Sequence, residues 1–239
     1  MGGFASRMLR VSRTNDLGQQ IGRDLKGWSA PSMVSYEPLG GRYVVLRPLR
    51  DEDADAVYGA LRDGPDSLWT YMTFDPFRSP HDPQQLIRFM RSQPDWRPYA
   101  IEVENKIEGF ATYLRIKPLD GVIEIGNIMY SPRLQRTTAA TEAVYLLMSH
   151  AFESGYRRVE WKCDALNVPS RVAGERLGFT YEGTFRNATH YKGRNRDTAW
   201  FAITAEHWPA HRETLETWLD PTNFDGDGQQ LRTLSQIRR

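Results

Sequence analysis

The stretch from Glu124 to Phe179 constrains the fold of this chain most. Residues 122–130 are largely β-branched and apolar and are expected to form a strand, which Ser131-Pro132 ends because proline cannot donate to a strand ladder. A short turn over residues 135–140 then leads into a helical run, Thr141 to Glu153. A strand followed by a turn that opens a helix leaves several main-chain N–H groups unpaired and aimed at one place. The stretch therefore predicts an anion site that suits a phosphate.

A second strand and helix follow directly. Residues 156–163 are typical of a strand, and residues 168–177 of a short helix that ends at Gly178. Antiparallel strands are expected at 43–49, 99–103, 107–116, 179–185, 188–192 and 198–204, with a turn at 193–197 and a closing helix at 209–219. This order predicts an α+β fold, a mixed and mostly antiparallel twisted sheet with one parallel strand pair, flanked by helices. A split between the two parallel strands would admit a long, thin ligand.

Composition and charge limit the classes of partner. The 239 residues are 40% hydrophobic, which is enough for a substantial core. Lys and Arg total 31 against 30 Asp and Glu, so the balance favours neither a nucleic-acid nor a membrane partner. The single Cys163 excludes an internal disulfide and a multi-cysteine zinc site, and suits a reducing compartment such as the cytoplasm. No apolar run approaches the roughly 20 residues of a membrane span, and we expect no metal.

Three parts of the chain differ in character. Residues 1–40 are expected to form an extended or partly disordered arm, with Trp28 and Tyr36 as anchors. Its first residues weakly match a transit peptide, through Arg7, Arg10 and Arg13, and a myristoylation pattern at Met1–Ser6, although an untargeted arm is favoured. Residues 41–208 form the main domain, and residues 209–239 a C-terminal helix with a polar, irregular tail. The helix, with Trp208 and Trp218, and the last strands could support a homodimer.

The motifs of the main domain resemble one known family. Gln135-x-x-Thr138-x-Ala140 stands where the GNAT superfamily of acyl-CoA-dependent N-acetyltransferases has Q/R-x-x-G-x-G/A. The continuation Ala140-Thr141-Glu142-Ala143, the pair Asn167-x-x-Ser170 before Leu177-Gly178-Phe179, and the run Glu182 to Arg186 resemble its RimJ/RimL-type branch. The resemblance covers roughly residues 41–208. It implies a GNAT N-acetyltransferase domain that uses acetyl-CoA as its acyl donor.

The resemblance also implies which residues bind the donor. The main-chain N–H groups of the turn are expected to bind the CoA pyrophosphate; they belong to Gln135, Arg136, Thr137, Thr138, Ala139 and Ala140. Main-chain groups of Met129 and Tyr130 and the side chain of Asn167 are expected to contact the pantetheine arm. Ser170 is expected either near the thioester or as a helix-capping partner. Thr138 departs from the usual Gly, so either the helix begins there in ordinary geometry or the phosphates lie farther away, with the hydroxyls of Thr137 and Thr138 adding contacts.

Glu124 is the candidate general base. An acceptor amine is charged at neutral pH and must lose a proton before it attacks a thioester, and a carboxylate in a cleft can take that proton. The position resembles the glutamate base of some histone-type members, although RimJ/RimL-type enzymes do not all keep an acid there; a Glu paired with an Arg across the sheet is the alternative. Asp164 and His190 are lesser candidates for base or substrate contact. The family's tyrosine acid would fall at Gly174, so Ser170 or water would protonate the leaving thiolate.

Two classes of function remain open. The first is an enzyme that transfers an acetyl group from acetyl-CoA to a primary amine, a protein N-terminus or a small amine, by direct attack on the thioester. The second is an acyl-CoA-binding sensor or partner-docking module without turnover, which Thr138 and the missing tyrosine keep open. The acceptor pocket is expected between the aromatic-rich segment 63–83 and the basic hairpin 186–197, which could also be a plain solvated hairpin.

Overall fold

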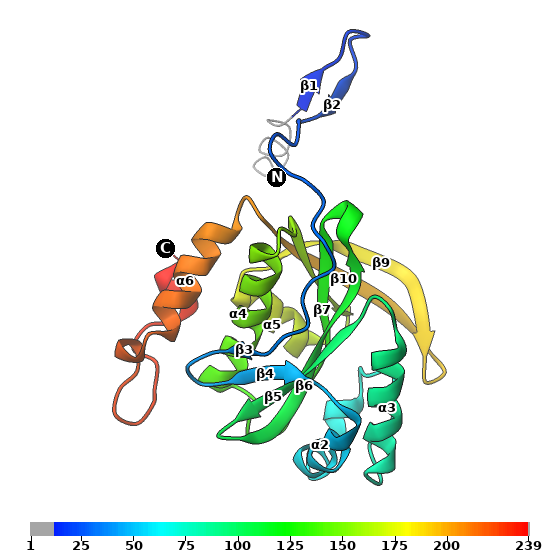
Figure 1. Cartoon of the computed structure of the whole chain (residues 1–239), viewed down its shortest axis with the longest axis vertical. Helices are drawn as coiled ribbons and strands as arrows, with labels where there is room; N and C mark the ends of the chain where they lie inside the picture. The colour runs from blue at the N-terminus through cyan, green and yellow to red at the C-terminus, as the bar shows by residue number, and fades with distance from the viewer. Residues whose placement is uncertain (1–11, 239) are drawn as a thin grey trace.

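The computed structural model describes residues 12–238 of the chain (Figure 1). The targeting patterns at Arg7, Arg10 and Met1–Ser6 therefore lie outside the described residues. The helices are α2 (Ala54–Leu61), α3 (His81–Ser92), α4 (Thr138–Glu153), α5 (Val168–Leu177), α6 (Trp208–Leu219) and α7 (Leu234–Ile237). The strands are β1 (Ser12–Thr14), β2 (Gln20–Gly22), β3 (Leu39–Gly40), β4 (Val45–Pro48), β5 (Arg97–Val103), β6 (Lys106–Lys117), β7 (Val122–Tyr130), β8 (Arg158–Asp164), β9 (Thr180–Tyr191) and β10 (Arg194–Thr204).

One mixed sheet forms the centre of the molecule. Among the described residues, eight strands join it in the order β3-β4-β5-β6-β7-β8-β10-β9. Neighbouring strands are antiparallel except β7 and β8, which are parallel. This confirms the predicted α+β fold and its single parallel pair beside the turn that opens α4.

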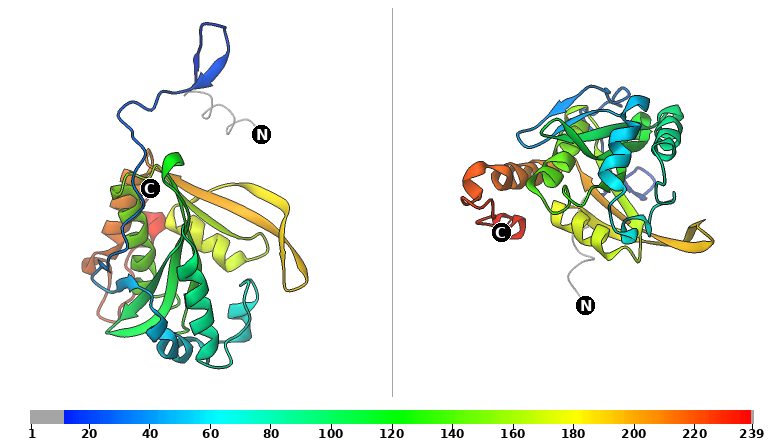
Figure 2. Two further views of the ribbon diagram at one scale, coloured as in Figure 1. Left: turned by 45° about the vertical axis from the view of Figure 1, so that its right-hand side comes forward. Right: turned by 90° about the horizontal axis from the view of Figure 1, so that it is seen from below.

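The two faces of the sheet carry different helices (Figures 1 and 2). Helices α4 and α6 pack on one face, against a core that includes Ile123, Val159 and Phe201. Helices α2 and α3 pack on the other face, against Phe110 and Met129. Because side chains alternate along a strand, the residues that flank Ile123, Val159 and Phe201 in the sequence point toward the α2–α3 face.

The N-terminal arm is anchored as the aromatic residues predicted. Strands β1 and β2 form a hairpin that stands away from the body (Figure 1). The indole N–H of Trp28 donates to the carbonyl of Gly155 at 3.2 Å, and the guanidinium of Arg157 lies over its ring. The hydroxyl of Tyr36 donates to the carbonyl of Pro98.

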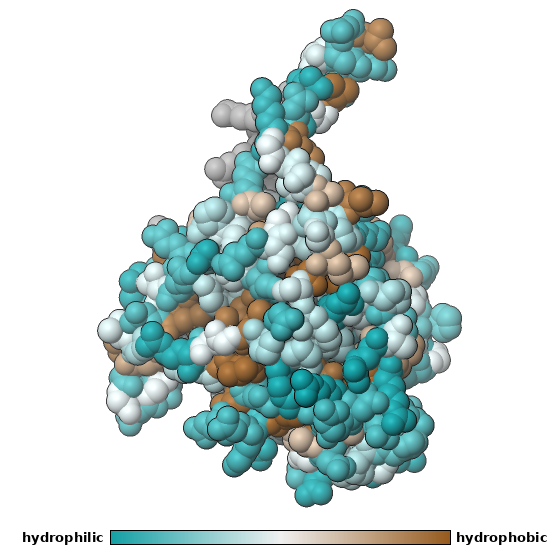
Figure 3. All heavy atoms as spheres, viewed as in Figure 1, coloured by the Kyte–Doolittle hydropathy of each residue, from teal (hydrophilic) through white to brown (hydrophobic). Residues whose placement is uncertain are grey.

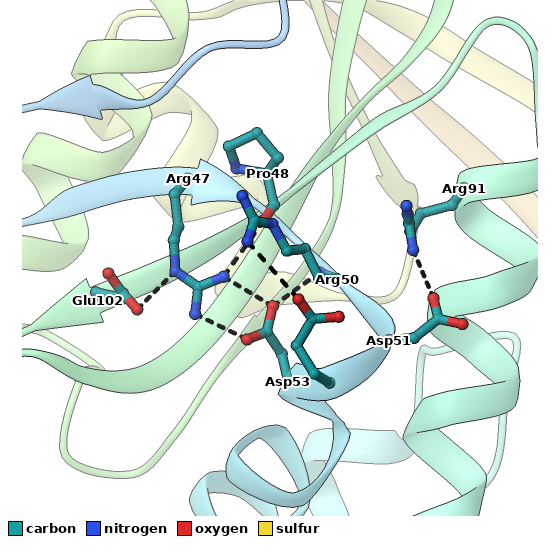
Figure 4. A network of polar contacts seen from close by, with 8 residues as sticks. Arg47, Pro48, Arg50, Asp51, Asp53, Arg91 and Glu102 are labelled. Carbon is teal, nitrogen blue, oxygen red and sulfur yellow. Dashed lines mark hydrogen bonds and ion pairs between the residues drawn. The ribbon is translucent and has the colours of Figure 1, made fainter.

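Acidic residues hold the entry to α2 (Figure 4). Asp51 and Asp53 lie in a 3₁₀ turn, Asp51–Asp53, directly before the helix. The guanidinium of Arg47 on β4 donates to both carboxylate oxygens of Asp53 at 2.8 Å and to Glu102 at 2.8 Å. Asp51 accepts from Arg91 of α3 at 2.6 Å, so the same turn joins β4, β5, α2 and α3.

Two local predictions were wrong. The segment predicted as two strands is the single strand β9, and it turns into β10 through Lys192 and Gly193 rather than through 193–197. Both turn residues have positive φ, 48° and 69°, as a two-residue hairpin requires. The tail is not wholly irregular, because Leu234–Ile237 forms a helical turn that packs on α6.

Apolar side chains gather on the surface between α6 and β3–β4, on an otherwise largely hydrophilic face (Figure 3).

Glu142 fixes the start of the sheet to α4. It is buried, and its carboxylate accepts main-chain N–H bonds from Arg42 at 2.9 Å, Tyr43 at 2.6 Å and Val44 at 3.0 Å. A Cβ at Gly41 would lie 2.4 Å from the same carboxylate, which explains the glycine. The motif Thr141-Glu142-Ala143 thus has a structural role that the sequence did not reveal.

We expect Glu142→Ala to lower the free energy of unfolding by about 2–3 kcal/mol, because it leaves buried N–H groups without their acceptor. Urea unfolding followed by circular dichroism measures the change. Glu213→Ala, at an exposed position of α6, is the matched control and should change stability by less than about 0.5 kcal/mol. Equal effects of the two substitutions would contradict the role of Glu142.

Candidate active site

The parallel strands β7 and β8 separate soon after they meet. Their ladder contains three pairs, Val122↔Arg158, Ile123↔Val159 and Glu124↔Glu160. Within residues 12–238 no further pair joins them, although β7 continues to Tyr130 and β8 to Asp164. Main-chain groups of residues 125–130 that face β8 are therefore free of the ladder, and a ligand placed between the strands can bond to them.

A bulge in β7 lies inside this opening. The register with β6 passes from Thr112↔Gly126 to Phe110↔Met129, so Asn127 and Ile128 oppose a single residue. Asn127 has a φ of 47°. The bulge moves the side chain of Met129 to the α2–α3 face, where it is 3% exposed. Beyond the bulge, the alternation of side chains in β7 is therefore shifted by one residue.

The turn after β7 presents free N–H groups at the start of α4. Arg136 has a φ of 62°, and Thr137 is the N-cap, whose hydroxyl accepts from the N–H of Ala140 at 3.1 Å. Across the described residues, the N–H groups of Arg136, Thr138 and Ala139 have no hydrogen-bond partner. They fit an anion such as a diphosphate, because a helix N-terminus favours negative charge.

The substitution of Thr138 for the usual Gly has a simple structural reason. Thr138 is the first residue of α4, in ordinary helical geometry, so no glycine conformation is needed. The hydroxyl of Thr137 donates to the carbonyl of Leu134 at 2.7 Å and caps the helix, so it is not free for a ligand. The side chain of Gln135 donates to the carbonyl of Tyr130 at 3.2 Å and ties the turn to the end of β7.

Asn167 and Ser170 lie at the start of α5, across the opening. Asn167 is the N-cap, and its side-chain oxygen accepts from the N–H of Ser170 at 3.1 Å. The hydroxyl of Ser170 accepts from the indole N–H of Trp161 at 3.1 Å. Gly174 packs beside the same indole, where a Cβ would lie 3.3 Å from Trp161, so this arrangement leaves little room for a side chain at the position of the family's tyrosine.

Glu124 lies where the two strands separate, on the α2–α3 face. It is 5% exposed, and its carboxylate forms an ion pair with the amine of Lys162 and lies 3.6 Å from the Nε of Arg115. Arg115 also approaches Glu160, at 3.9 Å. The side chains of Lys162 and Arg115 both lie over the ring of Trp200, at 4.3 and 4.9 Å from its centre.

This environment changes the acidity of both partners. Burial raises the pKa of Glu124 to about 7, although the charges of Lys162 and Arg115 act in the opposite direction. Burial also lowers the pKa of the Lys162 amine. A carboxyl with a pKa near neutrality can accept and release a proton under ordinary conditions, which a general base requires.

The two lesser candidates differ in their surroundings. Asp164 is 5% exposed, and its carboxylate accepts from the N–H of Leu166 at 2.9 Å and from the hydroxyl of Tyr191 at 2.8 Å. These bonds occupy both of its oxygens and give it a structural role at the end of β8. His190 is exposed near the tip of the β9–β10 hairpin, and the structure does not bring it to Glu124.

The hairpin tip meets the segment 63–83, and these are the two segments that we expect to line the acceptor pocket. Lys192 donates to the carbonyl of Trp69 at 2.9 Å, and Arg194 donates to that of Thr70 at 2.7 Å. The hydroxyl of Tyr71 donates to the carbonyl of Leu166 at 2.9 Å, between β8 and α5. These contacts bring the hairpin tip and the segment 63–83 together near the end of β8.

Sequence reasoning missed three side chains of this site. Lys162, Arg115 and Trp200 come from three different strands, and their types alone carry no motif. The alternation of buried and polar residues in β8 could have placed Lys162 on the same face as Glu124. The indole N–H of Trp200 is buried and has no partner among residues 12–238, so a ligand or water could accept from it.

Comparisons with known proteins agree with this geometry. A family model described as an acetyltransferase (GNAT) domain matches residues 44–180. A GCN5-related N-acetyltransferase from Brucella melitensis is 38% identical, with a TM-score of 0.86 over 90% of this chain and 99% of that one. A probable GNAT-family acetyltransferase from Chromobacterium violaceum is 35% identical, with a TM-score of 0.75 over 79% of this chain and 96% of that one.

The chain belongs to the GNAT acetyltransferase family. A search of curated proteins finds no significant match. A structure of RimL, a ribosomal L7/L12 N-acetyltransferase in complex with coenzyme A, is 19% identical, with a TM-score of 0.62 over 70% of this chain and 98% of that one, and shares the fold.

Family membership implies acyl transfer from acetyl-CoA. The free N–H groups at the start of α4 and the unpaired edge of β7 fit a CoA diphosphate and its pantetheine arm. Within residues 12–238, the GNAT domain has no helix long and apolar enough to cross a bilayer.

We expect Thr137→Ala to lower stability by about 1 kcal/mol and to weaken acetyl-CoA binding, because the cap holds the first turn of α4 in place. Calorimetric titration with acetyl-CoA and thermal unfolding measure the two effects. Thr138→Ala is the matched control, since the Thr138 hydroxyl makes no hydrogen bond among the described residues. An equal loss of affinity in Thr138→Ala would instead show that this hydroxyl contacts the ligand.

Proposed function

We propose that this GNAT enzyme transfers an acetyl group from acetyl-CoA to a primary amine by direct attack on the thioester. The observation that carries the proposal is the buried carboxylate of Glu124 at the point where β7 and β8 separate. The opening beside it is lined by an unpaired strand edge and ends at free N–H groups of α4. Donor and base would thus meet between the same two strands.

The residues divide the work as follows. The free N–H groups of Arg136, Thr138 and Ala139 hold the diphosphate, with Arg136 adding a charge, whereas those of Gln135, Thr137 and Ala140 already donate within the turn. Main-chain groups of Met129 and Tyr130 and the side chain of Asn167 orient the pantetheine arm. Glu124 accepts the proton of the acceptor ammonium, directly or through water, and the resulting neutral amine attacks the thioester carbonyl.

Ser170 or a water molecule supplies the proton to the leaving thiolate. A thiol ionises near pH 8 to 9, so the leaving group needs little assistance, and the glycine at 174 is compatible with catalysis. Ser170 lies on the α5 side of the opening and Glu124 on the α2–α3 side, so the acid and the base would approach the thioester from opposite faces. The acceptor enters between the segment 63–83 and the hairpin tip, near Asp164 and His190.

The acceptor is proposed as a protein N-terminus or a small amine. RimL, which shares the fold at 19% identity, acts on a protein N-terminus, and both kinds of acceptor are therefore included in the proposal. The free, buried Cys163 suits the reducing cytoplasm.

Release of free thiol from acetyl-CoA, with a panel of peptides and small amines, tests the proposal. We expect turnover with at least one amine, and a loss of about 10²- to 10⁴-fold in kcat/KM for Glu124→Gln. Glu160→Gln is the matched control, because it removes a carboxylate from the same charge cluster one strand away; its loss should be much smaller. Tight acetyl-CoA binding with no turnover on a broad panel would point to a sensor without catalysis.

We expect kcat/KM to rise with pH up to about 7 and to level off above it. Below that pH Glu124 is protonated and cannot accept the amine proton. Burial is the main cause of its raised pKa; the facing charges of Lys162 and Arg115 oppose the rise, and that of Glu160 adds the smallest contribution. A pH profile of wild type beside Glu124→Gln measures this. If the acid limb persists unchanged in Glu124→Gln, it belongs to the acceptor amine instead.

We expect Arg194→Ala to raise KM for the acceptor about two- to tenfold and to leave the Kd of acetyl-CoA unchanged. The substitution removes the hydrogen bond to Thr70, which contributes about 0.5–1.5 kcal/mol to holding the segment 63–83. Arg186→Ala, an exposed arginine of the same hairpin, removes an equal charge and is the control. A change in acetyl-CoA affinity alone would place the hairpin on the donor side.

A further inference from the structure

Lys162 lies inside the proposed active site in the place of an acceptor amine. Extending the register beyond the last pair, Glu124↔Glu160, by two residues sets Lys162 level with Gly126 on the separating strands. Its side chain is on the Glu124 face and 10% exposed, and its amine contacts the carboxylate of Glu124. Trp200 lies against the same amine, 4.3 Å from its ring centre.

An acceptor amine has the same requirement. Its nitrogen must contact the base, and it must lie beside the opening that the thioester enters. The Lys162 amine contacts Glu124 and lies beside that opening. Gly126, level with it on β7, has no side chain to stand between the amine and the unpaired strand edge.

Lys162 differs from the other lysines of the chain. The sequence has five lysines; Lys26, Lys106 and Lys117 are exposed, and the side chain of Lys192 is 22% exposed and donates to the carbonyl of Trp69. Unassisted chemical acetylation favours exposed amines, whereas acetylation within the site would select Lys162.

We propose that Lys162 is a self-acetylation site, at which the enzyme transfers an acetyl group from its own bound acetyl-CoA to the Nζ of Lys162. The inference rests on the proposed function. Glu124 first takes a proton from the Lys162 ammonium. The neutral Nζ then attacks the thioester carbonyl, so that an N–C bond forms and the C–S bond breaks. The nitrogen loses a second proton to the leaving thiolate, which departs as free CoA, and Glu124 releases its proton to solvent.

Two features of the site favour this step. Burial lowers the pKa of the Lys162 amine, which makes the neutral, nucleophilic form easier to reach. The β8 strand holds the lysine at a fixed place, and fixed geometry raises the rate of a reaction between neighbouring groups. The product amide is neutral, so it no longer forms an ion pair with Glu124.

The test uses the full chain incubated with acetyl-CoA and no added amine. Intact mass and peptide mapping should show one acetyl group at Lys162 before Lys26, Lys106 or Lys117 is modified. The rate should saturate with acetyl-CoA and be independent of protein concentration, as a reaction within one molecule requires. Acetic anhydride, which needs no binding site, should modify the exposed lysines first.

Variants sharpen the result. Glu124→Gln should slow acetylation of Lys162 at least about tenfold, and Lys106→Arg, an exposed control, should leave it unchanged. Because the mapping of the wild-type chain needs no variant, the test holds even if Glu124→Gln unfolds.

Three outcomes would overturn the inference. If the enzyme turns over an added amine while Lys162 stays unmodified, the self-acetylation is wrong and the proposed function stands. If Lys162 is modified no faster than the exposed lysines, the reaction is chemical and not enzymatic. If the chain neither binds nor cleaves acetyl-CoA, both the inference and the proposed function fail.

Discussion

The early separation of β7 from β8 is the constraint on which the rest of the site depends. Two parallel strands that stayed paired would have satisfied each other's main-chain groups and left no passage through the sheet. Here the ladder stops at Glu124↔Glu160, and the bulge at Asn127 redirects what remains of β7. The sheet thus carries a gap whose edge can bond to a ligand.

The walls of the gap are held by short-range capping interactions. Thr137 caps α4 on one side, and Asn167 caps α5 on the other. Glu142 on α4 accepts hydrogen bonds from the turn before β4, and these bonds hold the first strands of the sheet against this helix. These bonds leave the N–H groups of Thr138 and Ala139 free, which is the feature that the proposed diphosphate site needs.

The sequence predicted much of this fold because its signals are local. The elements around the gap are defined by the proline after β7, the glycine after α5 and the apolar runs of the strands. The order of these elements predicted the parallel pair. The cluster of Arg115, Lys162 and Trp200 around Glu124 could not be predicted, since it depends on which strands become neighbours across long stretches of chain. The bulge at Asn127 could not be predicted either. The residue pattern of β7 is that of an uninterrupted strand, and the bulge is defined only by its register with β6. The turn of the last hairpin was misplaced because Lys192, with its positive φ, carries no turn signature.

The most direct test is an NMR titration of the isotope-labelled protein with coenzyme A, followed through its main-chain amide resonances. We predict that the largest shifts fall on Arg136, Thr138 and Ala139 and on the residues of β7 beyond Glu124, with little change in the β1–β2 hairpin. Binding that left these amides unperturbed, or no binding at all, would contradict the central claim that the gap between β7 and β8 receives the donor.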